Sequence, residues 1–124
     1  MLHRRPASPH ITPAQAARRL GVTIKALRLY ESWGLVKPVR TDRGWRLYAP
    51  GDIERLSRAL AFKAMGFSLS EVVGLLDADA DALAAALATQ EQRLIARRAA
   101  VDEALGAVRR ARGGTAAARL RLAA

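Results

Sequence analysis

The sequence contains no cysteine and only two histidines, both within its first ten residues. A chain without cysteine can form neither a disulfide nor a thiolate metal site, which excludes a thiolate metal sensor. Its longest apolar run, ALAAALA at 82–88, is far too short to span a bilayer, and the basic start MLHRRPASPHITP lacks the apolar stretch of a signal peptide. We therefore expect a cytoplasmic protein with no membrane partner, no metal and no cofactor.

The residue patterns of an enzyme are also missing. The chain has no histidine beyond residue 10, no glycine-rich phosphate loop and no carboxylate pair in a recognisable pocket pattern. Asp77, Asp79 and Asp81 alternate, but a calcium loop needs more ligands in a longer frame, so an exposed turn explains them better. We expect no enzymatic activity.

Positive charge is abundant and unevenly spread. The net charge is +10, and residues 1–68 contain thirteen Lys or Arg against four Asp or Glu, whereas residues 69–124 contain eight against seven. This uneven charge indicates that the first half binds a polyanion and that the second half has a different role. The alternative is that the charge serves solubility alone.

Helix signals follow an N-terminal arm, residues 1–10, that we expect to be flexible. Thr12 before Pro13 is typical of a helix start, and the helix should end at Gly21. Thr23 should cap the next helix, which stops at Gly34. Two short helices joined by a tight turn predict a helix-turn-helix.

The second of these helices has two different faces. At 100° per residue, its apolar side covers an arc of roughly 160° and its polar side carries two cations one turn apart. We predict that Leu27 and Trp33 lie in the core and that Tyr30 is half-buried. Lys25 and Arg28 point outward together, where they could reach a DNA major groove, although an ordinary solvated face is the alternative.

A small β-hairpin is predicted next. Asp42-Arg43-Gly44 is turn chemistry between two extended pieces, 39–41 and 45–48, that carry arginines and aromatic residues. Such a hairpin beside a helix-turn-helix suits a wing that grips backbone phosphates. Whether Trp45 contacts DNA or packs the hairpin onto the helices stays open at this point.

Two further helices complete the first half. One should run from about Pro50 to Met65, with an apolar stripe. A short fourth helix should begin at Ser68 or Ser70. The stripe is formed by Ile53, Leu56, Leu60 and Ala64.

The second half is dominated by one long helix, from about 81 to 112, with no proline and one glycine. Its large apolar residues recur every seven positions, which is the pattern of a coiled-coil seam, interrupted by Gln90 and Arg97. A helix over roughly 40 Å long cannot bury this seam against so small a domain, so we expect it to pair with a second copy. The predicted dimerisation residues are Leu83, Leu87, Leu94, Val101, Leu105 and Val108.

Three blocks in order now indicate a family. AARRLGVTIKALRLYESWGLVKPVR, RGWRLYAPGDIERL and KAMGFSLSEVVGLL resemble the DNA-binding domain of the MerR family of bacterial transcription regulators. The resemblance covers 11–76, about half of the chain. It implies a mainly α protein: a winged helix-turn-helix domain over 11–77, then a dimerisation helix over 78–112 that pairs as an antiparallel coiled coil. For the short tail, 113–124, we expect no effector domain.

The resemblance also implies roles for single residues. Thr23, Lys25 and Arg28 match the positions that meet the major groove. Five further residues match family positions that contact the DNA backbone: Tyr30, Arg43, Arg46, Tyr48 and Lys63. The chain departs from the family pattern at Leu29, where a second aromatic residue is usual, and at Trp45, where tyrosine is commoner.

Three functions are compatible with these patterns. The first is a dimeric regulator that binds a pseudo-palindromic promoter site, distorts the DNA and thereby acts with RNA polymerase. The second is an architectural or excisionase-like DNA-binding protein that activates no promoter. The third is a basic coiled-coil adaptor for RNA or protein. No residue identifies a small-molecule effector.

Overall fold

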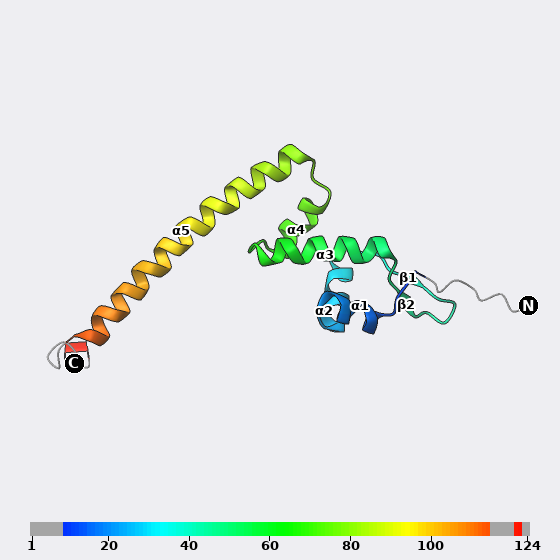
Figure 1. Ribbon diagram of the computed structural model, residues 1–124, viewed down its shortest axis with the longest axis horizontal. Coiled ribbons are helices and arrows are strands. Elements are labelled where there is room, and N and C mark those ends of the chain that lie inside the picture. The colour runs from blue at the N-terminus through cyan, green and yellow to red at the C-terminus, as the bar shows by residue number, and fades with distance from the viewer. Residues whose placement is uncertain (1–8, 115–120, 123–124) are drawn as a thin grey trace, which may run out of the picture. The chain divides into compact units, whose positions relative to one another are not determined.

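A computed structural model describes residues 9–114 and 121–122. The chain forms two compact units, and the boundary between them in the sequence lies between Leu83 and Ala84. The protein is mainly α-helical with one small antiparallel hairpin, as predicted (Figure 1). The elements are α1 (Pro13–Leu20), α2 (Ile24–Ser32), β1 (Val39–Arg40), β2 (Arg46–Leu47), α3 (Pro50–Ala64), α4 (Leu69–Leu76) and α5 (Ala80–Gly113).

The predicted helix caps are confirmed. The hydroxyl oxygens of Thr12, Thr23 and Ser68 each accept a hydrogen bond from the backbone N–H three residues later, at 3.2, 3.0 and 3.2 Å. These bonds satisfy donors that the first helical turn leaves without a partner. Gly21 ends α1 at φ 69°, a left-handed conformation that glycine adopts without strain.

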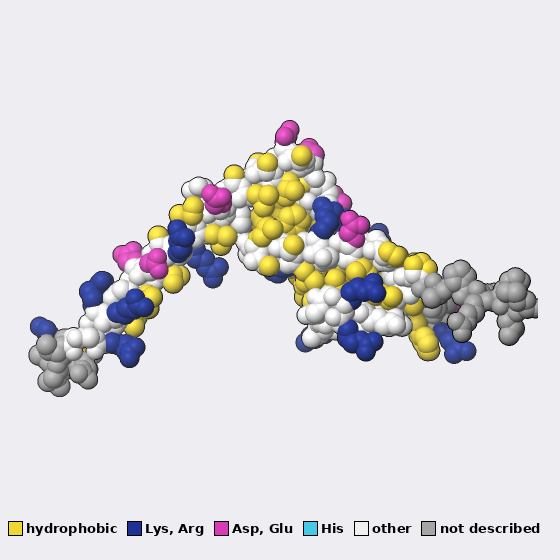
Figure 2. Space-filling view, in the orientation of Figure 1, with side chains coloured by type: hydrophobic (Ala, Val, Ile, Leu, Met, Phe, Trp, Pro, Cys, Tyr) yellow, Lys and Arg dark blue, Asp and Glu magenta, His cyan; other side chains and the backbone are white. Residues whose placement is uncertain are grey.

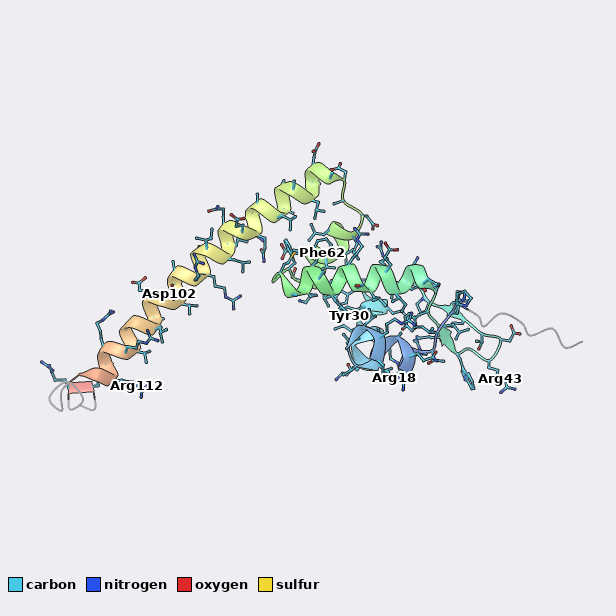
Figure 3. All side chains as sticks on the ribbon, in the orientation of Figure 1. Arg18, Tyr30, Arg43, Phe62, Asp102 and Arg112 are labelled. Carbon is cyan, nitrogen blue, oxygen red and sulfur yellow. The ribbon has the colours of Figure 1, made fainter. Side chains whose placement is uncertain are left out.

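The core of the first unit lies where α1, α2, α3 and α4 meet. Ala16 of α1 is completely buried, and its small side chain suits the closely packed α1–α2 pair. Phe62 of α3, labelled in Figure 3, packs edge to face against Phe67, and the ring centroids are 6.0 Å apart. The largest fully buried side chains are Tyr48, Leu27, Leu35, Leu56 and Val72.

Two core predictions were wrong. Trp33 is 45% exposed although its backbone is still helical, because the buried side of α2 is narrower than predicted and also leaves Leu29 47% exposed, whereas Leu35 is buried. The stripe predicted on α3 was too narrow. Because α3 packs against both α1 and α4, Ala59 and Phe62 are buried, whereas Ala64 is exposed.

The 34-residue α5 is a continuous helix about 50 Å long at the usual rise per residue. Its first turn is capped by Asp79, whose Oδ1 accepts a hydrogen bond from the backbone N–H of Ala82 at 2.8 Å. Figure 2 shows apolar side chains between charged ones along this helix. No helix in the described ranges is long and apolar enough to cross a membrane.

The two predicted ends of the chain fall largely outside the described residues. Only 9–10 of the predicted arm and 113–114 and 121–122 of the predicted tail are described. His3 lies outside them.

Candidate nucleic-acid interface

The helix-turn-helix presents the N-terminal half of α2 to solvent. Thr23, Lys25 and Arg28 are all exposed, while Leu27 on the opposite side is completely buried. The left-handed turn at Gly21 and the cap at Thr23 fix where α2 begins, and therefore where these cations project. Two long cations one helical turn apart, on a rigid element, can reach base edges or phosphates.

The hairpin formed by β1 and β2 lies beside this helix. Its register pairs Val39 with Leu47 and Arg40 with Arg46, and the turn is closed by Gly44 at φ 80°. Arg43 lies in the turn (Figure 3), with its guanidinium carbon 6.0 Å from the centroid of the Trp45 ring.

Trp45 is not packed onto the helices. Its side chain is 66% exposed, which answers the question that the sequence left open about its packing. An indole that is mostly exposed beside a cation has a free face, which can stack on a sugar or base.

A hollow of about 300 Å³ separates the beginning of α2 from the hairpin. Arg28 lies on one side of it and Trp45 and Arg46 on the other, so cationic and aromatic groups converge there. Its lining comprises Thr12, Pro13, Ile24, Arg28, Gly44, Trp45, Arg46, Leu47 and Tyr48.

Two of the predicted cations already have partners. The Nε of Arg46 donates a hydrogen bond to Oε2 of Glu31 at 2.6 Å, and the Arg40 guanidinium lies 3.8 Å from Oε1 of the same carboxylate. Lys63 donates from Nζ to the backbone carbonyl of Phe67 at 3.1 Å, near the end of α3. These contacts leave Arg43, Lys25 and Arg28 as the more open positions of the predicted set.

The two predicted tyrosines are buried. Tyr30 is 8% exposed and therefore lies deeper than the half-buried position that the helical pattern predicted. Tyr48 is completely buried, and its hydroxyl has no hydrogen-bond partner among the residues that the structure describes. Burial, followed by the nearby Glu31 carboxylate, raises the pKa of Tyr48 above its ordinary value, so the phenol stays neutral. A direct contact between Tyr48 and DNA stays a prediction.

Arg55 is a structural residue that the sequence analysis missed. Its Nε donates to the backbone carbonyl of Leu35, just after α2, and its two terminal nitrogens donate to the Asp77 carboxylate at 3.0 and 3.2 Å. This hydrogen-bonded ion pair lowers the pKa of Asp77. Arg55 thus ties the loop after α2 to the end of α4, and no local pattern could reveal partners 20 and 22 residues away.

Within the described ranges, no group of three or more His, Cys, Asp or Glu side chains could hold a metal ion. The interface instead combines exposed cations, an exposed indole and a rigid helix.

Comparison with known proteins agrees with this geometry. Residues 11–79, more than half of the chain, match the family model described as MerR HTH family regulatory protein. The chain belongs to this family. Among curated MerR-type relatives, it is 37% identical over 97 residues to the HTH-type transcriptional activator mta of Bacillus subtilis. That match covers 77% of this chain but only 38% of mta.

Solved structures of the MerR family share the fold. MtaN, the N-terminus of the Bacillus subtilis multidrug transporter activator, is 36% identical with a TM-score of 0.73, over 81% of this chain and 95% of that one. HiNmlR, a MerR regulator lacking the sensor domain that was solved on promoter DNA, is 23% identical with a TM-score of 0.60, over 78% and 79%. At that identity, the second likeness shows the fold alone.

Proposed function

We propose that this MerR-family protein is a sequence-specific DNA-binding transcription regulator. The observation that carries the proposal is the pair of exposed cations, Lys25 and Arg28, on α2 beside the exposed Arg43 of the hairpin. In this proposal α2 enters the major groove and the hairpin is a wing that contacts backbone phosphates. Thr23 contacts the DNA at the beginning of α2.

The electrostatics support this placement. The concentration of positive charge in residues 1–68 favours a polyanion, and each phosphate that a cation neutralises releases a condensed counterion. Arg43 and Trp45 together offer a charge and a flat apolar face to the sugar-phosphate backbone. Tyr30 and Tyr48 are buried, and Arg46 and Lys63 already have partners within the protein. A direct contact of these residues with DNA would therefore need a change of exposure or of partner.

The second part of the proposal is a homodimer formed through α5. Its apolar side chains are exposed to solvent in the single chain, and they recur at the seven-residue spacing of a coiled-coil seam. Leu87, Leu94 and Val101 are 39%, 42% and 56% exposed, with Leu105 and Val108 similar. A second copy of α5 would cover this seam, including Leu83 at its start, and present two recognition helices to a pseudo-palindromic site.

The direction of pairing is proposed to be antiparallel, and cysteine cross-linking tests it. The natural chain has no cysteine, so single variants Leu87→Cys, Leu94→Cys, Val101→Cys and Val108→Cys give unambiguous disulfides. In an antiparallel dimer, each seam position meets itself only near the twofold axis, so only the most central variants should cross-link. Cross-linking at all four positions would indicate a parallel coil instead.

The proposed mechanism is distortion of promoter DNA. A protein that contacts mainly the DNA backbone, with few base contacts, derives its specificity from how easily the DNA bends and twists. A regulator can use that distortion to help RNA polymerase bind the promoter. That mta and MtaN are activators supports this part of the proposal. The effector and the target genes are not part of the proposal.

Selection from genomic DNA tests the function. The purified protein is mixed with sheared DNA from its source at physiological salt, and the retained fragments are sequenced. Short inverted repeats between promoter elements are the expected result. Specific sites away from promoters would favour an architectural protein, and uniform retention that disappears with added salt would refute sequence-specific regulation.

A paired substitution separates the roles of helix and wing. Arg28→Ala should reduce discrimination between the selected site and random DNA by about 1–3 kcal/mol if its side chain contacts a base. Arg43→Ala should weaken all DNA about equally and make the salt dependence shallower. Titrations of both DNAs at several salt concentrations measure both effects, and the opposite pattern would exchange the two roles.

A further inference from the structure

Glu31 of α2 lies between two arginines of the wing. Its Oε2 accepts the hydrogen bond from Arg46 at 2.6 Å, and its Oε1 is 3.8 Å from the Arg40 guanidinium. The hairpin register places Arg40 and Arg46 directly opposite each other. Like charges at opposed positions repel, so the carboxylate between them offsets a repulsion that the hairpin would otherwise contain.

The hairpin needs an external support of this kind. Its strands are two residues long, and an isolated hairpin is at best marginally stable in water. At one end, Tyr48 pairs with Ile11, which ties the hairpin to the segment before α1. Glu31 supplies a separate tie to α2, the element that carries Lys25 and Arg28.

The contact between Glu31 and Arg46 is well shielded for a charged pair. The two side chains are only 22% and 27% exposed, and a hydrogen bond between two charged groups is shorter and stronger than one between neutral groups. A DNA phosphate would therefore have to displace a carboxylate that already holds the guanidinium. Arg43, by contrast, is exposed in the turn.

We infer that Glu31 is a positioning residue that fixes the wing against the recognition helix and keeps Arg46 away from DNA phosphates. The inference rests on the proposed DNA binding and deepens it. Arg46 then acts on DNA through the placement of the wing, which differs from the direct backbone contact that the family resemblance implies. Glu31 favours the correct site in two ways. It fixes the geometry of the wing, and it neutralises arginine charge that would otherwise bind any DNA.

Substitution of Glu31 by Gln tests this role. The variant keeps the size of the side chain but removes the charge, which weakens its hold on Arg46 and loosens the wing. Binding to random DNA should become tighter, and the slope of log K against log salt should steepen by about 0.9 for each arginine that gains a phosphate. Discrimination between the selected site and random DNA should fall.

Glu54→Gln is the matched control. Glu54 is exposed on α3, and the described residues show no ion pair to it, so the same chemical change there should alter neither slope nor discrimination. Thermal unfolding followed by circular dichroism verifies that both variants are folded. Arg46→Ala is the second test, because its salt slope should match that of the natural chain, whereas Arg43→Ala should be shallower by about 0.9.

The possible results separate the inference from the proposed function. Glu31→Gln could lose affinity equally for the selected site and for random DNA, with an unchanged slope of log K against log salt. That result would mean that Glu31 merely stabilises the domain, and it would overturn the inference. An unchanged variant, or a slope in Arg46→Ala as shallow as in Arg43→Ala, would overturn it too. If the natural chain itself showed no salt-dependent DNA binding, the proposed function would fail and the inference with it.

Discussion

Removal of the Tyr48 hydroxyl should stabilise the protein. Tyr48 is completely buried, and its hydroxyl has no hydrogen-bond partner among the described residues. A hydroxyl gives up its bonds to water when it is buried, and nothing in the folded domain replaces them. Tyr48→Phe keeps the aromatic ring in the core and deletes only the polar atom that bears this cost.

The size of the effect follows from the cost of burying an unpaired hydroxyl. Protein substitutions place that cost at about 1–3 kcal/mol, so Tyr48→Phe should raise the free energy of unfolding by roughly that amount. For a domain of this size, each kcal/mol corresponds to a rise of about 4–8 °C in the melting temperature.

Urea unfolding followed by circular dichroism measures the change. The midpoint should rise with an unchanged slope, at matched protein concentration because dimerisation would shift the apparent stability. Tyr30→Phe, at a tyrosine whose side chain keeps 8% exposure, is the control and should change little. A lower midpoint for Tyr48→Phe would refute the reasoning, since it would mean that the hydroxyl has a partner, such as a buried water molecule.

Alkaline pH gives an independent measurement on the same group. Because burial raises the pKa of Tyr48 in the folded protein, the unfolded chain releases the phenolic proton first, at a pH of about 10. The stability of the natural protein should therefore fall as the pH rises above that value, and Tyr48→Phe should reduce the fall.

Two further substitutions test local features of the fold. Asp77→Asn removes the partner of Arg55; because Arg55 lowers the pKa of Asp77, the stability from this pair is present above a pH of about 4 and is lost as the pH falls through the lowered pKa. Urea unfolding should thus show a less stable variant at neutral pH and a difference in stability that shrinks as the pH falls below about 4, and a constant difference would contradict the assignment. Gly21→Ala places a side chain at φ 69° with no atom within 4 Å of the new Cβ, so the cost should be conformational alone, about 1–2 kcal/mol. A melting temperature equal to that of the natural chain would show that the turn adjusts.

Local chemistry made much of the fold predictable from the sequence. The threonine and serine caps bond to a backbone N–H three residues later, and a glycine in a left-handed conformation ends a helix. Local residues were therefore enough to locate α1, α2 and α4. The prediction for Trp33 failed because the helical period does not show how wide the buried side of α2 is, and both Trp33 and Leu29 lie outside it.

The contacts that organise the candidate site could not be predicted in this way. Glu31 reaches a residue 15 positions away and Arg55 one 22 positions away, and the chain contains many other charges that could have paired. The burial of Tyr48 likewise depends on how the hairpin rests on the helices. The sequence indicated which charged residues could contact DNA, whereas the structure shows which of those charges have partners within the protein.

The bridge between Ile11 and Tyr48 makes the wing mechanically continuous with the beginning of the domain. Two backbone hydrogen bonds, of 2.9 and 2.8 Å, join these residues in both directions. A force applied from the N-terminal side therefore reaches the wing through this bridge before it loads α1. When the chain is pulled between its N-terminus and a point after Gly113, we therefore expect the force to load this bridge before the helices of the first unit.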